Sequence, residues 1–412
     1  MIQKIKGTMD ILPDETPLFR YIEGIMREEA EKYGFGEIRL PTFELTELFV
    51  RGVGDTTDVV QKEMYTFLDG EDSITLRPEG TAGVVRAFIE NGKYGDTMPQ
   101  KYYYIMSCFR HEKPQAGRTR EFFQFGTEMF GSEAPSADAS VIALAAAVLR
   151  RLGLKNVRLH LNSIGCKECR PAFKSALVKH FSSHTGELCD TCRGRLDKNP
   201  LRLLDCKSPI CSAIAKEAPR TVDHLCPACE EHFAKLKSYL DAMGIEYTVD
   251  PAIVRGLDYY TRTVFEFVAE GIAAQSTVCG GGRYDGLVES LGGPALSGIG
   301  FGMGITRVIM ALEQASLATL PPVCPKLYIA SLGEKATLSA FAITERLRRE
   351  GVYAECDLVG RSLKAQMKYA NKLGADYTLI LGDSEIESGK AQLRDMKNST
   401  QTEVELATFT LN

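Results

Sequence analysis

The residues best suited to chemistry lie in one stretch, FRHEKPQAGRTREFFQFGTE (109–128). Its centre is a basic loop between two strand-like runs, 102–109 and 121–130, and the basic residues are Arg110, Lys113, Arg118 and Arg120. A hairpin connection usually has about two to five residues, so this loop is long, and long loops in compact domains are commonly functional. Because arginine makes planar, bidentate contacts with phosphate oxygens, the sequence predicts a phosphate site here. Phe122 follows the loop and is placed to stack on a base.

A second candidate for a nucleotide site is the glycine-rich run GIGFGMG (298–304), which Arg307 follows. The run does not match G-x-G-x-x-G, and the chain contains no G-x-x-x-x-G-K-[ST] motif. The glycines alone indicate close packing of a strand on a helix, and a lone Arg307 would be a solvated surface charge. Its grouping with the arginines of the basic loop favours a nucleotide site. We expect 301–315 to form a helix that begins on these glycines.

Cysteines are concentrated in residues 163–232, which hold eight of the chain's 12. Three C-x-x-C pairs and two further cysteines occur there: Cys166/Cys169, Cys189/Cys192, Cys226/Cys229, Cys206 and Cys211. Such pairs supply tetrahedral thiolates to zinc. One reading is therefore structural zinc, with Cys166, Cys169, Cys189 and Cys192 as ligands. A helical insertion whose cysteines are small buried apolar residues fits equally well.

The totals restrict the class of protein. A chain of 412 residues is too long for one small core and favours two or three domains. Its net charge of -5 argues against a protein coated in nucleic acid, although a local basic groove would not show in the sum. The first twenty residues lack the apolar run of a signal peptide, and the longest apolar stretch, 139–149, is too short to span a bilayer. We expect a cytoplasmic protein with no membrane segment and with reduced cysteines.

Regular elements must position these residues. Residues 15–35 have apolar positions at helical spacing, and 37–44 are expected to form an edge strand because they contain Pro41. A hairpin around Gly70–Glu71 and helices at 80–92 and 136–152 are also expected. Beyond a proline-rich linker at 315–325, strands alternate with helices at 336–350 and 362–373, which predicts a compact βαβαβ domain.

Several of these stretches together resemble the class II aminoacyl-tRNA synthetases. FRHE, the basic loop and FFQFGTE resemble motif 2, GIGFGMGITR resembles motif 3, and the helix leading to RLPTFE resembles motif 1. Within that class, TLRPEGT (75–81), VRGLDYYTRTVFEF (254–267) and GGGRYDGL (280–287) resemble the histidyl-tRNA synthetases of bacterial type. The resemblance covers nearly the whole chain, and its combination with RGLDYYT is highly specific.

The resemblance implies an α+β architecture. A class II catalytic domain, with a mainly antiparallel sheet flanked by helices, would occupy residues 1–324. A helical, cysteine-rich subdomain would be inserted at about 163–232, and an α/β anticodon-binding domain would follow at 325–412. Motif 1 implies a homodimer.

The resemblance also implies a pocket for histidine. Its members would be Glu79, Gly80, Thr81, Gln124, Glu128, Tyr259, Tyr260 and Tyr284. Glu79, Thr81 and Gln124 would face the ammonium group, and Glu128 and Tyr260 the imidazole. From position alone, Glu79 is equally well explained as a first-turn carboxylate favoured by a helix dipole. A site that pairs both imidazole nitrogens needs no editing, so no editing domain is expected.

For ATP, the resemblance implies binding by Arg110, Glu112, Phe122 and Arg307, with Mg²⁺ arriving together with ATP. Gln115 and Arg118 would reach the acceptor end of the tRNA. Arg110 and Arg255 would be catalytic, with Arg255 stabilising the charge that develops at the α-phosphate. From the sequence alone, an ion pair of Arg255 with Asp258 is the favoured explanation.

Three lysines recur every four residues in 360–374 and share one helix face: Lys364, Lys368 and Lys372. Most charge stripes are solvated faces, but a stripe of one sign without acidic partners also suits a phosphate backbone. The resemblance to an anticodon-binding module implies that Lys364 and Lys368 contact tRNA.

The function implied is histidine–tRNA ligation, with L-histidine, ATP and tRNA(His) as partners. One alternative is the synthetase-like regulatory subunit of histidine biosynthesis, which lacks an anticodon-binding domain and the full motif set. Another is a synthetase for a different amino acid, which would keep the motifs but not RGLDYYT.

Overall fold

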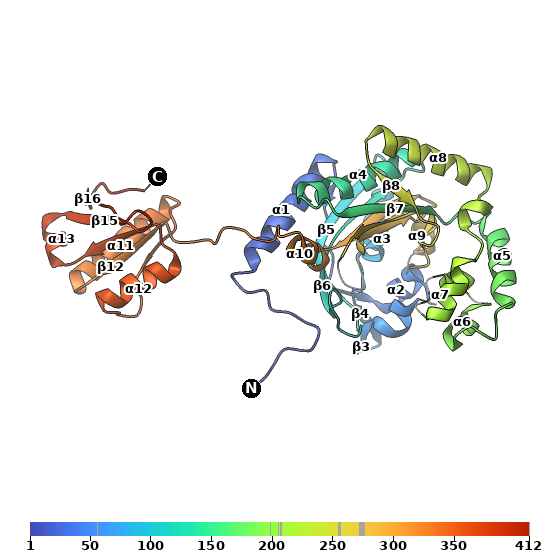
Figure 1. The fold of residues 1–412 in the computed structure, drawn as a ribbon, viewed down its shortest axis with the longest axis horizontal. Helices are drawn as coiled ribbons and strands as arrows, with labels where there is room; N and C mark the ends of the chain where they lie inside the picture. Colours follow the sequence, from blue (N-terminus) through green and yellow to red (C-terminus); the bar gives the residue numbers. More distant parts are fainter. Residues whose placement is uncertain are drawn as a thin grey trace. The chain divides into compact units, whose positions relative to one another are not determined.

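The computed structural model describes residues 1–411 except 56, 198, 205, 207, 254–256 and 272–276. The chain divides into two compact units, Met1–Leu320 and Pro321–Asn412, whose elements are labelled in Figure 1.

The first unit is built on an eight-stranded sheet with the order β1-β5-β6-β11-β10-β9-β7-β8. Its strands are β1 (Gly36–Glu37), β5 (Gln100–Phe109), β6 (Glu121–Phe130), β7 (Val157–Ser163), β8 (Tyr247–Val249), β9 (Thr261–Ala269), β10 (Thr277–Arg283) and β11 (Gly298–Gly304). The central strands pair antiparallel, and the edge strands β1 and β8 pair in parallel with their neighbours. The predicted mainly antiparallel sheet is confirmed.

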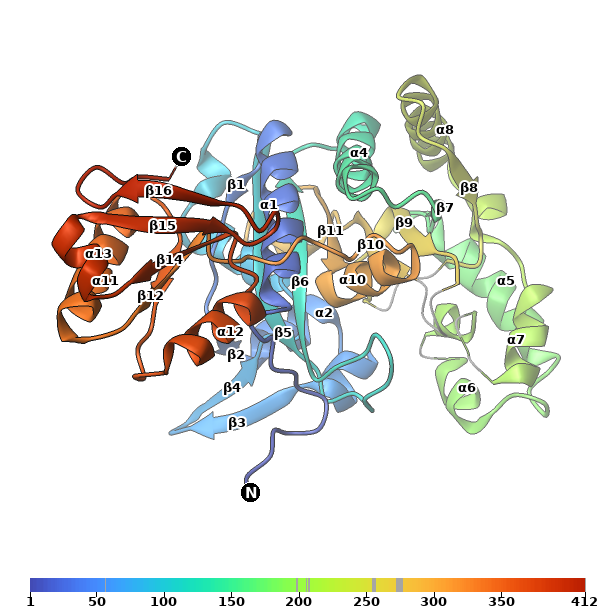
Figure 2. The same ribbon diagram turned by 60° about the vertical axis from the view of Figure 1, so that its left-hand side comes forward.

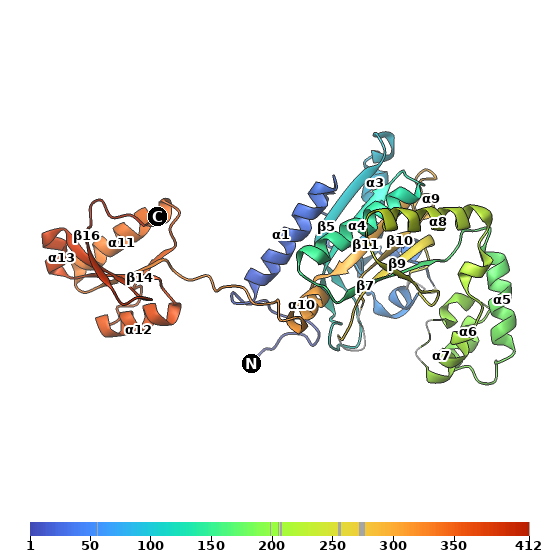
Figure 3. The same ribbon diagram turned by 45° about the horizontal axis from the view of Figure 1, so that its top comes forward.

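Helices cover one face of this sheet and build the main core. In Figure 3, α1 (Thr16–Lys32), α4 (Pro135–Arg151) and α8 (Pro227–Ala242) lie along that face, and α10 (Ile305–Gln314) packs beside them. Phe125 of β6 and Phe301 of β11 are buried among these helices. Because side chains alternate across a strand, the residues between them point to the opposite face.

That opposite face carries α2 (Thr46–Val53), α3 (Thr81–Glu90) and α9 (Leu287–Ser290), together with a second apolar cluster that includes Val84, Phe88 and Phe130. A three-stranded sheet adjoins it, with β2 (Phe43–Leu45), β4 (Asp72–Leu76) and β3 (Tyr65–Asp69) in that order. The predicted hairpin is confirmed as β3 and β4, which project together in Figure 2. Two short turns, η1 (Val59–Glu63) and η2 (Lys93–Gly95), also belong to this unit.

Two predicted elements are wrong. The strand expected over 37–44 is divided between β1 and β2, which belong to different sheets. Pro41 lies in the gap, and it has no N–H for a ladder. The helix expected to begin on the glycines of 298–304 begins only at Ile305. The glycines form β11, since they alternate with buried apolar residues at the period of a strand.

The cysteine-rich insertion leaves the sheet after β7 and is helical, as predicted. It contains α5 (Arg170–Ser182), α6 (Asp190–Arg195), η3 (Pro200–Leu203), α7 (Pro209–Lys216) and η4 (Thr221–His224) before α8 leads back. These helices share a small core of their own, which includes Phe173, Leu177 and Leu203. Figure 1 shows α5, α6 and α7 grouped at one end of the sheet.

The second unit has a five-stranded sheet with the order β13-β12-β14-β15-β16. The elements are β12 (Leu327–Ser331), α11 (Glu334–Arg349), β13 (Ala354–Cys356), α12 (Leu363–Leu373), β14 (Tyr377–Leu381), α13 (Asp383–Ser388), β15 (Lys390–Asp395) and β16 (Gln401–Glu405). The predicted βαβαβ core is confirmed by the parallel pairing of β12 with β13 and β14. The final hairpin was not predicted, because its strands are largely polar.

Candidate active site

The glycines of β11 clear space for side chains on the face opposite the main helices. Gly300 pairs with Glu128 and Gly302 with Gly126 across β6. A Cβ at Gly300 would lie 2.1 Å from Glu128 Oε2, and one at Gly302 would lie 2.5 Å from Gln124 Nε2. The glycines of β11 therefore leave room for the side chains of Glu128 and Gln124. Neither close packing of a strand on a helix nor a nucleotide site, the two explanations drawn from the sequence, predicted this role.

Glu128 lies at the centre of this face and is fully buried. Its Oε1 accepts hydrogen bonds from Thr81 Oγ1 at 2.7 Å and Tyr104 Oη at 3.3 Å, and its Oε2 accepts one from Tyr284 Oη. Burial raises the pKa of the Glu128 carboxyl to about 8, against the opposing effect of the hydrogen bonds from Tyr284 and Thr81. The described residues therefore surround Glu128 with hydroxyl donors.

Tyrosines line the space around Glu128. The rings of Tyr259 and Tyr260 lie 4.6 Å apart, and that of Tyr259 meets Tyr284 edge-on at 5.6 Å. Burial raises the pKa of Tyr259 and of Tyr284 well above the ordinary value for tyrosine. The structure thus brings together the three tyrosines predicted for the pocket.

Tyr104 also lies against Glu128, and sequence reasoning missed it. Its ring lies over the backbone of β6, where a Cβ at Gly126 would be 2.2 Å from its Cζ. Tyr104 pairs with Gly126 in the β5–β6 register. The sequence did contain a signal for it. Gln124, Gly126 and Glu128 lie on the same face of one strand, and a glycine on that face leaves room for a large side chain from the neighbouring strand.

Glu79, Gly80 and Thr81 form the entrance to α3. The Glu79 carboxylate is 3% exposed and accepts the backbone N–H groups of Thr81 at 2.7 Å and Ala82 at 2.8 Å. Glu79 precedes the N-cap Gly80 and does not lie in the first turn, but its carboxyl still accepts N–H groups at the start of α3. It places a second buried carboxyl near Glu128. Burial raises the pKa of Glu79. Gly80 admits the Tyr104 ring, which would lie 2.4 Å from a Cβ there.

Arg77 fixes this entrance and was also missed. It is 9% exposed, and its guanidinium donates to the carbonyl oxygens of Ser107 at 2.6 Å, Leu40 at 2.9 Å and Pro41 at 3.0 Å. It therefore ties the end of β4 to β5 and to the proline segment, using carbonyls that no ladder satisfies.

The basic loop folds as a tight turn beside the pocket. Gln115 and Arg118 exchange backbone hydrogen bonds of 3.1 and 2.9 Å, and Arg118 pairs with Glu112 at 3.1 Å. Gly117 takes φ +73 at the tip, in the left-handed region that favours glycine. Gln115 is exposed.

Two arginines join the basic loop to its surroundings. Arg110 lies over the Phe122 ring at 5.4 Å and donates to the Pro78 carbonyl at 2.8 Å. Arg307 of α10 donates to the carbonyls of Gly117 at 3.0 Å and Thr277 at 2.8 Å. The residues predicted for ATP are therefore grouped around one loop, adjacent to the pocket entrance.

Arg255 lies outside the described residues. Asp258, its alternative ion-pair partner in the sequence-based interpretation, accepts hydrogen bonds from Asn199 at 3.3 Å and Arg202 at 3.4 Å. Arg170 of α5 donates to the carbonyl of Tyr260. The insertion therefore contacts the segment that carries the pocket tyrosines.

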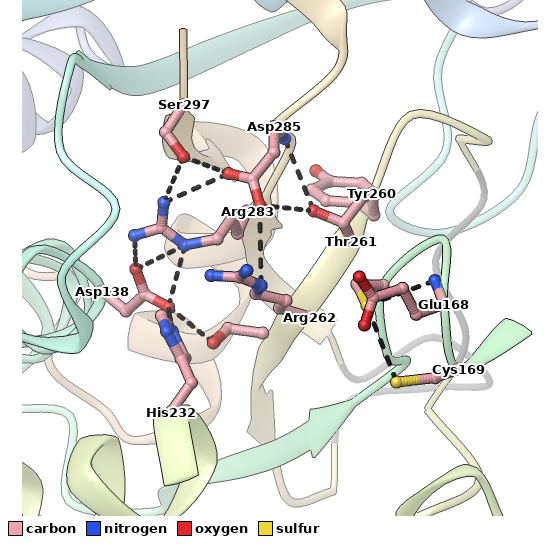
Figure 4. Close-up of polar contacts among 12 residues, drawn as sticks. Asp138, Glu168, Cys169, His232, Tyr260, Thr261, Arg262, Arg283, Asp285 and Ser297 are labelled. Atoms are coloured by element: carbon pink, nitrogen blue, oxygen red, sulfur yellow. Dashed lines mark hydrogen bonds and ion pairs between the residues drawn. The ribbon is translucent and has the colours of Figure 1, made fainter. Parts of the chain in front are cut away.

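A buried charge network lies behind the site (Figure 4). Arg283 of β10 is fully buried and forms an ion pair with Asp138 of α4. Its guanidinium also donates to Ser297 Oγ at 2.8 Å, and Asp138 accepts from Thr263 Oγ1 at 2.6 Å and lies 2.8 Å from His232 Nε2. Removing either Arg283 or Asp138 would leave the other charge buried without compensation. The network therefore fixes β10 against α4 and α8.

The cysteines correct one prediction. Cys166, Cys169, Cys189 and Cys192, proposed as a single ligand set, belong to two separate groups. The sulfur atoms converge as Cys166, Cys169, Cys226 and Cys229, and as Cys189, Cys192, Cys206 and Cys211. Sequence spacing could not assign the pairs, since C-x-x-C motifs combine only once the helices between them are placed. Both groups are of a kind that can hold a metal ion.

In the second unit, Lys364, Lys368 and Lys372 are exposed on α12. Within the described part of the chain, none of the three forms an ion pair with an acidic side chain. Arg361 does not belong to this free stripe, because it pairs with Asp357 at 2.7 Å. Leu363 and Met367 pack against the sheet.

Among the residues that the structure describes, no helix combines the length and apolar character needed to cross a bilayer.

Matches to known proteins cover nearly the whole chain. Residues 7–308 match the family model of histidyl-tRNA synthetase, and residues 326–410 match that of the anticodon binding domain. The histidine–tRNA ligase of Caldanaerobacter subterraneus subsp. tengcongensis is 52% identical over 400 residues, which cover 97% of this chain and 96% of that protein. The enzyme of the same name from Caldicellulosiruptor bescii is 52% identical over 406 residues, covering 98% and 96%.

Solved structures of histidyl-tRNA synthetases also match this chain. Apo histidyl-tRNA synthetase of S. aureus is 40% identical with a TM-score of 0.84, covering 99% of this chain and 98% of that one. A Bacillus halodurans structure described as an ATP phosphoribosyltransferase regulatory subunit/histidyl-tRNA synthetase is 22% identical with a TM-score of 0.64, covering 93% and 98%, and shares the fold. The high identity over full length, with both family models matched in order, shows that this chain belongs to the histidyl-tRNA synthetase family of class II aminoacyl-tRNA synthetases.

Proposed function

We infer that this chain is an enzyme that joins L-histidine to tRNA(His) in two steps, using ATP. The observation that carries this inference is Glu128, a fully buried carboxyl whose contacts are hydroxyl groups. A buried carboxyl of this kind suits a ligand that brings its own N–H donor. Histidine has such a donor on its imidazole, and its ammonium group suits the second buried carboxyl, Glu79.

The pocket would recognise each part of histidine separately. Glu128, with Tyr260, would pair with the imidazole, and Tyr259 and Tyr284 would enclose the ring. Glu79, Thr81 and Gln124 would face the ammonium group, with Gly80 leaving the space for it. An amino acid without both ring nitrogens would leave Glu128 without its ligand donor, and such sites discriminate by about 10⁴ to 10⁵ without editing.

ATP would bind along the basic loop. Arg110 would hold the α-phosphate, Phe122 would stack on adenine with Glu112 at its edge, and Arg307 would cover the nucleotide from α10. The carboxyl of Glu63 offers an oxygen ligand of the kind that Mg²⁺ prefers. Mg²⁺ brought with ATP would neutralise phosphate charge.

In the first step, a carboxylate oxygen of histidine would attack the α-phosphorus of ATP, and the bond to pyrophosphate would break. Arg110 would stabilise the charge that develops on the α-phosphate oxygens. Arg255 would do so from the other side, a role that rests on the family motif because this residue lies outside the described residues. In the second step, a terminal hydroxyl of the tRNA would attack the histidyl carbonyl, and AMP would leave.

The tRNA would meet two parts of the chain. Gln115 and Arg118, at the tip of the basic loop, would reach the acceptor end. The second unit, which we assign to residues 325–412, would bind the anticodon region, with Lys364 and Lys368 contacting phosphates. Their exposure on one face of α12 supports this assignment.

We also propose that the enzyme is a cytoplasmic homodimer. Phe43, Leu45 and Phe67 are 55%, 54% and 48% exposed on the three-stranded sheet, and Leu45 and Phe67 flank Ile74 in its register. Monomers rarely expose apolar residues in such continuity. Sedimentation should give twice the chain mass for the wild type and a shift toward monomer for Phe43→Asp. A wild type that sediments as a monomer at micromolar concentration would rule out the dimer.

Charging of tRNA tests the function and separates it from the regulatory alternative. The full chain, labelled histidine, ATP and Mg²⁺ should charge a tRNA(His) transcript and leave a tRNA for another amino acid uncharged. A chain that binds histidine but never charges tRNA(His) would support the regulatory subunit instead. Charging with a different amino acid would support the third reading.

A further inference from the structure

The eight cysteines of the insertion form two compact groups. The base site consists of Cys166, Cys169, Cys226 and Cys229, and the outer site of Cys189, Cys192, Cys206 and Cys211. Within each site the four sulfur atoms all lie within 4.8 Å of one another. All eight are free thiols.

The separations between the sulfur atoms match a single tetrahedral ion. Zinc bound by thiolates has Zn–S distances of about 2.3 Å, so the edges of its sulfur tetrahedron are about 3.8 Å. In the base site, Cys166 Sγ lies 3.7 Å from Cys169 Sγ and 3.8 Å from Cys226 Sγ. In the outer site, Cys189 Sγ lies 3.9 Å from Cys206 Sγ. A disulfide needs about 2.05 Å, so these pairs are not bonded.

Backbone amides also point at the sulfur atoms. In the base site, the N–H of Cys226 donates to Cys169 Sγ at 3.0 Å and that of Glu168 donates to Cys166 Sγ at 3.4 Å. In the outer site, the N–H of Cys189 donates to Cys211 Sγ at 3.3 Å. Cys169 and Cys226 also stand at the starts of α5 and α8, where the dipole favours negative charge. The amide donors common to both sites suit thiolates.

The turn before α5 is built for this geometry. Gly165 has φ +66, and a Cβ there would lie only 2.7 Å from Cys169 Cβ. A left-handed glycine is therefore needed to bring Cys166 back beside Cys169.

Simple burial does not explain the two groups. Cys166, Cys189, Cys206 and Cys226 are only partly buried, whereas cysteines that act as apolar filler would be buried. The apolar core of the insertion is small, and small cores usually need a disulfide or a metal as an additional constraint.

We propose that the insertion holds two structural zinc ions, one in the base site and one in the outer site. The base site joins the start of α5 to the start of α8, and so closes the insertion on itself. It also places Arg170, which follows Cys169 and donates to the Tyr260 carbonyl. The outer site fixes η3, beside which Asn199 and Arg202 reach Asp258 at 3.3 and 3.4 Å. The two ions thereby hold the insertion against the segment that carries the pocket tyrosines.

Metal content of the full chain tests the proposal. The protein is produced in zinc-supplemented medium and purified without chelators or a metal-affinity step, and zinc and iron are measured by mass spectrometry. We expect about two zinc ions per chain and no stoichiometric iron. One ion per chain, iron in place of zinc, or less than about a tenth of an equivalent in folded protein with reduced thiols would each overturn it.

Paired substitutions test which cysteines share an ion. Cys166→Ser with Cys226→Ser should lose about one zinc ion, and so should Cys189→Ser with Cys206→Ser. Cys166→Ser with Cys189→Ser should lose both, because it damages both sites. Cys324→Ser is the matched control and should keep both. Loss of a single ion from Cys166→Ser with Cys189→Ser would show that those two residues share a site, and the assignment would be wrong.

Cobalt provides a measurement that does not depend on variant folding. Wild-type protein loaded with Co²⁺ should show the visible and near-ultraviolet absorption of tetrahedral cobalt thiolate, rising until about two ions are bound per chain. A spectrum of octahedral cobalt would contradict the four-thiolate sites whatever the variants do.

Discussion

Glu128 is the residue on which amino acid selection rests in this account. Replacing it with Gln keeps the shape but places an N–H₂ group among hydroxyl donors and removes a carboxyl oxygen that would accept from the imidazole. We expect Glu128→Gln to lower kcat/KM for histidine activation by at least about a hundredfold, because a buried donor left unmatched costs about 1–3 kcal/mol and the hydrogen bond to the imidazole is lost as well. Pyrophosphate exchange at varied histidine concentration measures it.

The control for this substitution is Glu133→Gln, at an exposed position beyond the end of the same strand. It should retain near-normal exchange. Full activity of Glu128→Gln, with the substitution verified, would remove Glu128 from the pocket.

The raised pKa of Glu128 makes a separate prediction about stability. The folded carboxyl holds its proton up to a pH of about 8, whereas an ordinary glutamate releases it near 4.5. The folded state therefore binds more protons between these values, so its stability is fully present below about pH 4.5 and falls as the pH rises through 8. Thermal midpoints of the wild type and Glu128→Gln should diverge across that window, with the variant gaining relative stability at high pH. Parallel curves would show that Glu128 ionises normally.

At the residue scale, several residues that the family motifs assigned to one pocket lie together around Glu128. The motifs did not identify Tyr104 or Arg77, since both act through contacts that depend on strand register and on distant carbonyls. Nor could the sequence decide between the two explanations for Glu79, because the cap on α3 and a ligand contact use the same carboxylate.

At the scale of elements, β11 offers a test of why its glycines are needed. A Cβ at Gly302 would lie 2.5 Å from Gln124 Nε2, the far end of a flexible side chain, whereas one at Gly304 would be no closer than 3.7 Å to any neighbour. We expect Gly302→Ala to fold normally but to displace Gln124, raising KM for histidine about ten- to a hundredfold. Gly304→Ala is the matched control and should change it little. If Gly302→Ala and Gly304→Ala change the thermal midpoint and the KM for histidine by the same amount, Gly302 is not needed to make room for Gln124.

The basic loop predicts a split between the two half-reactions. Arg118 lies at its tip, so Arg118→Ala should reduce transfer to tRNA more than adenylate formation. Its ion pair with Glu112 predicts a small additional effect on ATP. Single-turnover transfer and pyrophosphate exchange measure the two steps separately, with Lys113→Ala, exposed on the same loop, as control. Equal losses in both steps would contradict the split.

Element type was predictable where the period of apolar residues was clear, as in α1, α4 and the β5–β6 hairpin. It was wrong for β11, where glycine hides the alternation, and for 37–44, where a proline divides one apolar run between two sheets. The final hairpin of the second unit was not predicted from the sequence because β16 is mostly polar and solvent-facing.

At the scale of the whole molecule, tRNA affinity should depend on the second unit. Lys364→Ala with Lys368→Ala should weaken tRNA binding and reduce the slope of log K against log salt by about 1 to 2, because each phosphate contact releases counterions. Lys335→Ala with Lys397→Ala removes the same charge from exposed positions outside α12 and should leave the slope unchanged. An identical salt dependence in both double variants would show that the stripe is only solvated.

The proline linker and the change of pattern predict a second domain from residue 325, and the structure divides the chain into compact units at Leu320 and Pro321. The sequence could not divide the cysteines between two sites, since that division depends on how α5 to α8 fold back on one another.

The most direct test of the central claim is ATP–pyrophosphate exchange by the full chain with each of the twenty amino acids in turn. The account predicts exchange that depends on histidine and exceeds that with any other amino acid by at least about 10⁴-fold, because only histidine pairs with both Glu79 and Glu128. Exchange supported by another amino acid at a comparable rate, or no exchange with histidine by folded, ATP-binding protein, would contradict it.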